Sequence, residues 1–563
     1  KNTKDLIPML EIHQYVNLFF EKSRGYGGNS MDQVREEGWK SFYKGLVDLF
    51  VVAPTDFDLE LAPEAFFDNF SIAAGAGVNS NLKTVGDYNE ISSHPIIKLG
   101  NQKYFIPVSF SVFEAVYESP FYWMIKDESY RELAGQRRGK AGEQITYNFL
   151  KKVFGAERTF KSVKIRSLQT EKSTKSRDDK TDIDVLCVLG SKALCVQVKS
   201  KKLTELAKKG NDEALGRDFK AAVQDAYDQG KLSRIEVLSR EAQFIDEFGN
   251  EIVLSESIDE VYIMGVTTEN YPSLTHQAST LLSKDVEDPF PLFLTLFDLE
   301  LLSHYLADPY DFLYYVRQRV DLMEYFKADE EIVFLGYHLI HKLWRIPKSD
   351  RSVLDNDFGQ LIDRNYYPYK LGLEIPNDGD QIASRWKNDD FERLCDRIKS
   401  LSEPKVTDII FHLYDWSGDA RDALLKYLLK AKKQALADGK RHNFSMPPSE
   451  RDPSQIGVTY FVIASNSYYE LREKLTVLVR LRKYKSKGKA WIGIGSLKDS
   501  PEIVDAIFFD EAPWEYDEDL ERLSSELLEG AGGGRLIRLG EKVGRNERCL
   551  CGSMQKYKRC CGE

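Results

Sequence analysis

The sequence lacks several features that would place it in a familiar class. No run of about 18 apolar residues occurs, so no membrane-spanning segment is expected. The opening stretch Lys1–Asp5 leads into no signal-peptide core, which predicts a cytoplasmic protein. No Walker-type phosphate loop is present, so the ATPase and helicase classes lack support. No repeat of roughly 20 to 50 residues is visible, which argues against a solenoid.

The chain is also short of positive charge. Its 563 residues include 78 Lys plus Arg against 89 Asp plus Glu, for a formal net charge of −11. Such a chain is not a general polyanion binder, so any contact with nucleic acid must come from local basic patches. Hydrophobic residues make up 42% and charged residues 30%, which excludes bulk disorder. The length predicts about three to five domains.

Cysteine is scarce outside the C-terminal tail. The chain has 7 cysteines. Cys187, Cys195 and Cys395 lie in apolar or helical surroundings and are predicted to be buried thiols. The other four fall close together at the end of the chain, at Cys549, Cys551, Cys560 and Cys561. Four thiols in one short cytosolic stretch indicate a zinc site and not a disulfide framework.

The pattern along the chain predicts a multidomain α/β protein. Five regions are expected: an N-terminal α/β region at 1–130, an α/β core with a mixed sheet at 131–270, a mainly helical region at 271–403, a second α/β domain at 404–528, and a Gly-rich linker with a zinc knuckle at 529–563. The linker is Gly530–Gly534, which isolates the cysteine tail from the preceding chain.

Local patterns give the expected elements of the two α/β regions. In the first, we expect helices at 130–154 and 218–229, each closed by the glycine that follows, and strands at 181–189, 193–199 and 261–267. In the second, we expect strands at 408–414, 458–464, 491–495 and 506–510. A strand at 104–108 and an aromatic helix at 113–125 are expected in the N-terminal region.

The most informative residues lie on two adjacent predicted strands. Asp182 and Asp184 share one face of the first strand, and Gln197 and Lys199 share one face of the next, because side chains alternate along a strand. A tight turn at 190–192 sets the strands side by side, so the polar faces converge. Carboxylate and amide oxygens suit Mg²⁺, and a lysine beside the metal can stabilise charge on a phosphate. Glu143, on the preceding helix, is a candidate further ligand or base.

This arrangement resembles the PD-(D/E)xK restriction-endonuclease-like superfamily over roughly residues 131–270. Matched by position, the resemblance implies that Asp184 binds the metal, Gln197 occupies the acidic position, Lys199 is the catalytic lysine and Glu143 is the helical glutamate. Gln197 departs from the main pattern and is similar to the Q-x-K form of the Mrr-like branch. The departure removes one formal charge from the metal site. The implied cofactor is Mg²⁺ or Mn²⁺.

Substrate contacts are expected from basic and helical positions around this site. Lys220, Gln224 and Tyr227 fall on one face of the following helix, which in this superfamily often contacts the substrate backbone. Lys201 and Lys202 follow the catalytic strand. Two basic stretches, 161–180 and 472–489, run against the net charge. Tyr484 and Trp491 lie in or beside the second stretch and are candidates for stacking on bases. A solvated helix face remains the alternative for these groups.

The cysteine tail has a recognisable spacing. The elements Gly544-Arg545-Asn546, Cys549-Leu550-Cys551-Gly552-Ser553 and Lys556-Tyr557-Lys558-Arg559-Cys560-Cys561 give C-x-C-x8-C-C. Four thiolates can close a tetrahedral zinc site, and so short a segment has no core without one. The tail resembles a SEC-C motif, the zinc knuckle found at the end of the SecA translocase and on many other bacterial proteins. The resemblance implies Zn²⁺, a bacterial origin, and a knuckle that binds protein or nucleic acid.

Together these features predict a bacterial metal-dependent nuclease that acts on nucleic acid, with DNA as the expected substrate. Large accessory regions without a motor or a methylase suggest genome defence, for example against phage, which is an inference from architecture alone. The alternative is a non-catalytic nucleic-acid-binding or regulatory protein on a degenerate nuclease fold. A third possibility, a secretion-related adaptor, rests on the knuckle only. The oligomeric state and the trigger do not follow from the sequence.

Overall fold

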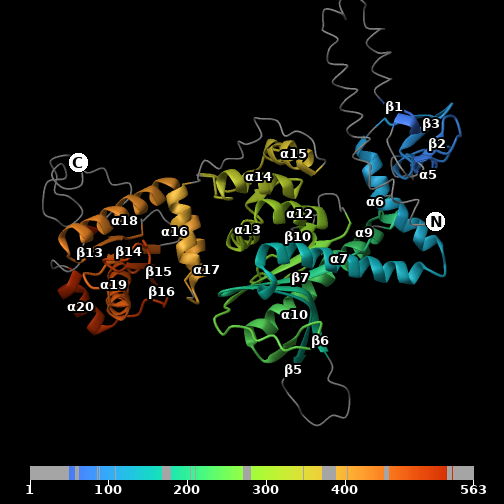
Figure 1. The fold of residues 1–563 in the computed structure, drawn as a ribbon. Helices are drawn as coiled ribbons and strands as arrows, with labels where there is room; N and C mark the ends of the chain where they lie inside the picture. Colours follow the sequence, from blue (N-terminus) through green and yellow to red (C-terminus); the bar gives the residue numbers. More distant parts are fainter. Residues whose placement is uncertain are drawn as a thin grey trace, which may run out of the picture.

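A computed structural model gives the fold of the chain (Figure 1). It describes residues 50–56, 63–84, 87, 89–107, 109–167, 179–202, 204–208, 211–269, 280–346, 348–370, 388–401, 403–448, 456–528 and 535–536. The protein is mixed α/β with several mixed sheets, as the sequence predicted. None of the helices described in these ranges combines the length and the apolar character needed to cross a lipid bilayer.

The N-terminal unit, residues 50–126, is built on a small mixed sheet. The strand order is β1-β4-β3-β2. Its elements are β1 (Val51–Val52), α5 (Pro63–Phe70), β2 (Ser71–Ala73), β3 (Ile96–Gly100), β4 (Lys103–Phe105) and α6 (Ser109–Lys126). Strand β4 confirms only the start of the strand expected at 104–108, and residue 108 lies outside the described residues. Helix α6 confirms the aromatic helix.

The central sheet has six strands in the order β10-β9-β7-β6-β5-β8. Its elements are α7 (Arg131–Phe154), β5 (Thr159–Ser167), β6 (Asp179–Leu189), β7 (Lys192–Lys199), α8 (Glu205–Lys208), α9 (Asp212–Phe219), α10 (Asp225–Ser239), β8 (Ala242–Ile245), β9 (Glu260–Thr267) and β10 (Leu292–Thr295). Each neighbouring pair is antiparallel from β8 through β5 and β6 to β7. Each neighbouring pair is parallel from β7 through β9 to β10. Strand β10 comes from beyond residue 270, so the sheet crosses the boundary expected there.

The two faces of this sheet are covered by different helices. Val185, Cys187 and Val196 pack with the buried side of α7 in the largest hydrophobic cluster. Ile263, on β9, packs with Tyr227 and other residues of the α9–α10 helix on the opposite face. Strands β6 and β7 therefore lie between two helical layers, and their polar residues can reach solvent only near the strand ends.

One expected helix end is wrong. Gly230 does not close the helix, because α10 continues to Ser239, where Arg240 adopts a left-handed C-cap conformation. A Cβ at Gly230 would lie 2.5 Å from the Ile263 side chain, so this glycine allows close packing of α10 on β9. A π-helical segment, Lys220–Gln224, joins α9 to α10.

Residues 292–399 confirm the expected helical region after the first strand. Its helices are α12 (Leu296–Tyr305), α13 (Pro309–Asp321), α14 (Glu331–His341), α15 (Asp357–Lys370) and α16 (Asp389–Lys399). Two short parallel strands, β11 (Phe326–Lys327) and β12 (Ser352–Val353), connect them. Phe312, Tyr314 and Tyr315 of α13 are fully buried in the core of this region.

The C-terminal unit, residues 403–536, holds a five-stranded sheet in the order β16-β15-β14-β13-β17. Its elements are α17 (Val406–Asp415), α18 (Gly418–Asp438), β13 (His442–Met446), β14 (Ile456–Val462), α19 (Tyr468–Ser486), β15 (Ala490–Ser496), β16 (Ala506–Asp510), α20 (Glu518–Leu528) and β17 (Arg535–Leu536). The three later expected strands are confirmed. The strand expected at 408–414 is wrong, because this segment is helix α17. Its apolar residues Val406, Ile409 and Leu413 fall at helical spacing, a period that the β-branched character of the segment obscured.

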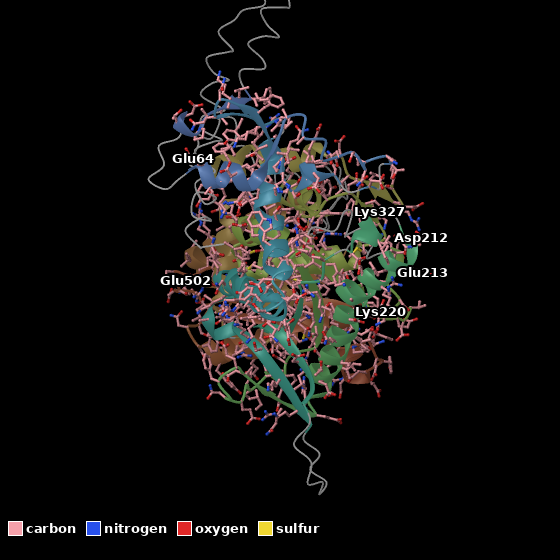
Figure 2. The ribbon with its side chains drawn as sticks, turned by 90° about the vertical axis from the view of Figure 1, so that its right-hand side faces the viewer. Glu64, Asp212, Glu213, Lys220, Lys327 and Glu502 are labelled. Atoms are coloured by element: carbon pink, nitrogen blue, oxygen red, sulfur yellow. The ribbon has the colours of Figure 1, made fainter. Side chains whose placement is uncertain are left out.

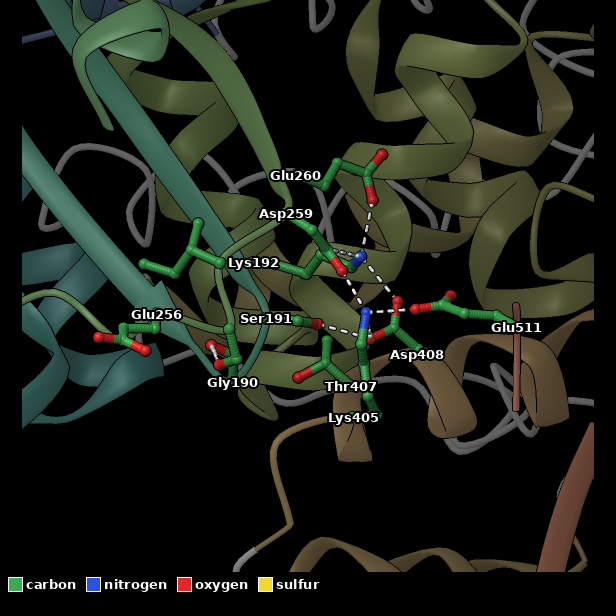
Figure 3. Close-up of polar contacts among 12 residues, drawn as sticks. Gly190, Ser191, Lys192, Glu256, Asp259, Glu260, Lys405, Thr407, Asp408 and Glu511 are labelled. Carbon is green, nitrogen blue, oxygen red and sulfur yellow. Dashed lines mark hydrogen bonds and ion pairs between the residues drawn. The ribbon is translucent and has the colours of Figure 1, made fainter. Parts of the chain in front are cut away.

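The turn between β6 and β7 is anchored to α17 by buried polar contacts (Figure 3). Ser191 donates from Oγ to Asp408 Oδ2 at 2.6 Å, and Lys192 Nζ lies 2.7 Å from Asp408 Oδ1. Lys192 also contacts Asp259 at 2.8 Å. Gly190 has φ +59, and a Cβ there would lie 2.5 Å from Thr407 Oγ1. The end of the hairpin away from the polar residues is therefore fixed against the C-terminal unit.

Candidate active site

Helix α7 approaches the sheet closely where it carries the first candidate residue. A Cβ at Gly142 would lie 2.6 Å from Thr268 Cγ2 and 3.4 Å from Val198 Cγ1. Only a residue without a side chain fits this contact. The next residue, Glu143, is half-buried and lies beside the ends of β6 and β7, close enough to feel the charges of Asp182 and Lys199.

Strands β6 and β7 separate at the second candidate residue. Their regular pairing ends at Val185 and Val196. Beyond it, Asp184 Oδ2 accepts a hydrogen bond from the backbone N–H of Val198 at 2.6 Å. The Asp184 side chain thus occupies the position at which the two backbones would otherwise pair, and its second oxygen is not engaged by this bond.

Gln197 is held inside the opening and not at its surface. Its side chain is 1% exposed, and Nε2 donates to the backbone oxygen of Asp182 at 2.8 Å. The amide nitrogen therefore bridges β7 to β6. This leaves Oε1 as the atom of Gln197 that can serve the metal role expected from the sequence.

Lys199, at the end of β7, is positioned by the opposite helix. Its Nζ donates to Gln229 Oε1 on α10 at 2.5 Å. Gln229 precedes Gly230, whose close packing on Ile263 brings α10 against the sheet. The candidate site therefore lies between α7 and α10 at the open end of the hairpin, and it joins Glu143, Asp184 and Lys199.

The carboxylates of this site are held in a poor environment for negative charge. Burial raises the pKa of Asp184 to about 6, with the charges of Glu143 and Asp182 adding to the effect and the Val198 N–H and Lys199 opposing it. Burial also raises the pKa of Glu143, opposed mainly by Lys161 and reinforced by Asp182. Partly buried carboxylates with raised pKa values gain from a cation placed between them.

The donor set fits an ion that takes few protein ligands. Among the residues that the structure describes, no three His, Cys, Asp or Glu side chains are grouped closely enough to hold a metal ion by themselves. Mg²⁺ is commonly bound by one or two carboxylates, with water and substrate phosphate completing its shell. The free oxygen of Asp184 and the carboxylate of Glu143 match that requirement, with Gln197 Oε1 as a neutral third donor.

Lys201 and Lys202, two of the predicted substrate-binding lysines, form ion pairs within the protein. Lys201 Nζ lies 3.3 Å from the buried Asp218. Lys202 Nζ lies 2.5 Å from Glu118 on α6 and 3.5 Å from Glu269, with its charge 4.5 Å from the centre of the Tyr122 ring. Both lysines therefore stabilise the packing around the site, and Lys202 ties the N-terminal unit to the central sheet.

The predicted helix face of Lys220, Gln224 and Tyr227 is also largely engaged. Tyr227 is 1% exposed and donates from its hydroxyl to Asp288 at 2.8 Å. Gln224 exchanges hydrogen bonds with the backbone of Ser283 at 2.9 Å in both directions. Lys220 lies at the surface, as Figure 2 shows, and pairs with Asp225 at 2.6 Å. The three residues do not form one open surface.

The rings proposed to stack on bases are buried. Trp491 is 1% exposed and donates from Nε1 to Thr459 Oγ1 at 2.8 Å. Tyr484 is 5% exposed and packs beside Trp514. The base-stacking prediction is therefore wrong for both residues. From the sequence alone an aromatic residue beside a basic run indicates a surface position, whereas β15 and α19 direct these rings into the core.

Sequence reasoning missed two residues that shape the site. Lys161, on β5, donates from Nζ to Gln144 on α7 at 2.7 Å and lowers the pKa of Glu143. Gln229 holds Lys199. Neither belongs to a short motif, because each reaches the site from an element that pairs or packs with the hairpin. The earlier part of the basic stretch 161–180 lies on β5, and residues 168–178 lie outside the described residues.

The linker Gly530–Gly534 and the predicted zinc ligands Cys549, Cys551, Cys560 and Cys561 also lie outside the described residues. The other three cysteines are buried free thiols, as predicted. Their burial raises the pKa of each thiol, so none is suited to act as a nucleophile or a metal ligand.

Comparison with known proteins supports one part of the sequence interpretation. Residues 545–563 match the SEC-C motif family, a zinc-binding type of motif, which supports Zn²⁺ in the tail. No curated protein and no solved structure matches the chain.

Proposed function

We propose that the protein is a metal-dependent nuclease of the PD-(D/E)xK type, with its active site formed by Glu143, Asp184, Gln197 and Lys199. One observation carries this proposal. Two carboxylates with raised pKa values, Glu143 and Asp184, lie with Lys199 at the end where β6 and β7 separate. The order of elements α7, β6, β7 and α9–α10 agrees with the order on which the resemblance rests.

Each side chain has a role in phosphodiester hydrolysis. Mg²⁺ bound by Asp184 and Glu143 would polarise the phosphate and lower the pKa of a water molecule. Lys199 places its ammonium group where negative charge develops on the phosphate, and the bond to Gln229 fixes that position before substrate arrives. Gln197 keeps the opening between β6 and β7 in shape through its bond to Asp182.

The proposed substrate is nucleic acid, with DNA preferred, and the SEC-C tail supplies a tethered zinc site that binds the substrate or a protein partner. Cys549, Cys551, Cys560 and Cys561 are the proposed zinc ligands, inside the segment that matches the motif. A role in defence against phage belongs to the same proposal and rests on architecture alone.

The test is cleavage by purified protein of plasmid, linear single strands and RNA, with and without Mg²⁺ or Mn²⁺. We expect Asp184→Asn, Glu143→Gln and Lys199→Ala each to lower the cleavage rate by about 10² to 10³ with little change in melting temperature. Asp419→Asn and Lys433→Ala, exposed residues of α18, serve as matched controls and should cleave normally. Metal-independent cleavage, or full activity of the Asp184 or Lys199 variant, would reject the site.

One observation favours a second function, a nucleic-acid-binding protein on an inactive nuclease fold. Gln197 occupies the position where the superfamily usually has an acidic residue, and its amide nitrogen donates to the backbone oxygen of Asp182. If that contact is its whole role, the site lacks one ligand charge. Binding of nucleic acid without cleavage under every metal condition, together with normal binding by Asp184→Asn, would select this alternative.

A further inference from the structure

We propose that the solvent face of α7 is the track along which a nucleic-acid strand leaves the candidate active site. This inference rests on the proposed function and adds the path of the substrate. The helix on the other side of the site, α9–α10, fills its predicted contact residues with intramolecular partners. Helix α7 presents the opposite situation, because it carries exposed lysines both before and after Glu143.

The face is a single stripe. Lys140, Gln144, Tyr147 and Lys151 lie three or four residues apart, so they fall on one side of the helix. Lys140, Gln144 and Lys151 are exposed and Tyr147 is partly exposed. Lys152 is exposed next to Lys151. The stripe from residue 140 to residue 152 is about 18 Å long at the helical rise, or about five nucleotides at the spacing of a B-form strand.

The cations of this stripe are available to a ligand. Within the part of the chain that the structure describes, no ion pair involves Lys140, Lys151 or Lys152. Lys151 Nζ lies 5.5 Å from the centre of the Tyr147 ring, a contact that leaves its charge unneutralised. Among the described residues, three lysines of one helix thus have no ion pair, which gives an acidic protein a local positive surface for a polyanion.

The stripe is continuous with the candidate active site. Lys140 lies three residues before Glu143 on α7, so the two side chains project from the same side of the helix. Lys161 Nζ bonds to Gln144, which belongs to the stripe. A strand bound along α7 therefore has its backbone directed toward Asp184 and Lys199.

The far end of the stripe meets an aromatic surface. Helix α7 packs against α12, which carries His304, and Lys152 lies within electrostatic reach of that ring. The His304 ring lies 5.2 Å from the ring of Tyr369, whose side chain is 58% exposed. Exposed rings next to cations are suited to stacking on unpaired bases, which favours a nucleic-acid strand over an acidic polypeptide as the occupant.

The experiment measures binding without cleavage. Full-length protein and a variant with Lys140→Gln, Lys151→Gln and Lys152→Gln are titrated into fluorescent single-stranded DNA in the presence of Ca²⁺. Affinity is recorded by anisotropy over a range of salt concentrations. We expect the affinity of the triple variant to be about tenfold to hundredfold lower near 0.1 M salt. The plot of the logarithm of the binding constant against the logarithm of salt concentration should become less steep by about 2.

A charge-matched control lies on α18, where Lys426, Lys430 and Lys433 are exposed. Replacing these three by Gln removes the same charge and should leave affinity and slope unchanged. Equal losses in the two triple variants, or no loss in the α7 variant, would overturn the track. Tyr369→Ala should weaken binding without changing the slope, and unchanged affinity would exclude the aromatic end.

The same titrations with duplex DNA and with RNA identify which strand is held best. Competition by poly-glutamate at equal charge would overturn the assignment to nucleic acid. The outcomes are separable from those of the proposed function. Loss of cleavage in Asp184→Asn with unchanged binding by the α7 variant leaves the nuclease and removes the track. If no cleavage occurs but binding depends on the α7 lysines, the track remains and the nuclease proposal is rejected.

Discussion

Lys199 and Gln229 meet across the candidate active site, with Nζ of the lysine 2.5 Å from Oε1 of the glutamine. The two residues come from different layers, since Lys199 ends β7 and Gln229 lies on α10. The bond orients a flexible side chain, and a lysine fixed before substrate arrives loses less conformational entropy on binding. Gln229 is therefore a positioning residue.

We predict that Gln229→Ala lowers the cleavage rate about tenfold at saturating substrate, with KM nearly unchanged, because the ammonium group is no longer held. Gln229→Glu keeps the acceptor oxygen and should restore most of the rate. Rate constants at saturating substrate, measured beside Gln434→Ala, an exposed glutamine of α18, as a control, check this. Equal activity of the Ala variant and the natural protein would contradict the positioning role.

The raised pKa of Asp184 predicts opposite pH effects on activity and stability. Metal binding needs the carboxylate, so cleavage should increase as pH rises through about 6. More Mg²⁺ should move this rise to lower pH, because the ion competes with the proton. The measurement is the cleavage rate from pH 5 to 8 at two Mg²⁺ concentrations, and a flat profile would argue against Asp184 as a ligand.

For stability the sign is reversed. The native carboxyl group binds its proton more tightly than the unfolded chain does, whose Asp has a pKa of about 3.9. The native state then binds more protons between about pH 4 and 6, so the free energy of unfolding should fall as pH rises through that window. Asp184→Asn should remove this dependence, which chemical denaturation at several pH values can test.

Gln197 permits a prediction about its two ends. Gln197→Glu keeps an oxygen for the metal but loses the donor to the Asp182 carbonyl. In the presence of a chelator we therefore expect the free energy of unfolding to fall by about 1 to 3 kcal/mol. With Mg²⁺ present, this variant should still cleave. Gln197→Leu should lose cleavage. Melting temperatures with and without Mg²⁺ decide, and normal cleavage by the Leu variant would make Gln197 purely structural.

The pair Lys192–Asp408 anchors the hairpin turn. Both side chains are buried, so Lys192→Met alone should destabilise the protein by about 3 to 5 kcal/mol. Adding Asp408→Asn should recover part of the loss, with a coupling energy of about 0.5 to 3 kcal/mol. The exposed pair Asp519–Arg522 is the control, and Asp519→Asn should cost under about 1 kcal/mol. Strictly additive losses would contradict the coupling.

The tail predicts a zinc content that can be removed without losing catalysis. A chain ending at Leu528 should lack one zinc per molecule, and Cys549→Ser should mimic the loss, since residues 545–563 match a zinc-binding motif. Cleavage should persist at high substrate concentration with weaker apparent affinity, because a tethered site acts through local concentration. Elemental analysis and kinetics measure both. Full zinc content after truncation would contradict the assignment.

Much of the site's local structure was accessible from the sequence, because it depends on short-range patterns. Alternation along β6 and β7 and the turn at Gly190 predict that Asp184, Gln197 and Lys199 belong to one hairpin, and the structure has that hairpin. The burial of Cys187 follows from the same alternation, whereas Cys195 shares a face with Gln197 and is buried because α10 covers that face. Helix α7 is recovered to within one residue, with Gly155 at its C-cap.

What escaped prediction depends on packing between distant segments. Helix α17 is the exception, because its β-branched residues favour a strand although Val406, Ile409 and Leu413 fall at helical spacing. The basic residues around Tyr484 and Trp491 predict a surface position for both rings. In the fold both rings are buried by elements that the local sequence does not reveal. The partners of Lys202 and Tyr227 come from Glu118 and Asp288, far away in the sequence.

The parallel pairing of β10 with β9 has a consequence for how the chain can be divided. Strand β9 is buried along almost its whole length, and β10 satisfies the backbone groups of its outer edge. A fragment ending near residue 270 would expose that edge, a long apolar template open to pairing with other molecules. Such a fragment should come out of cells as insoluble aggregate, whereas one that continues through residue 306 should remain in solution.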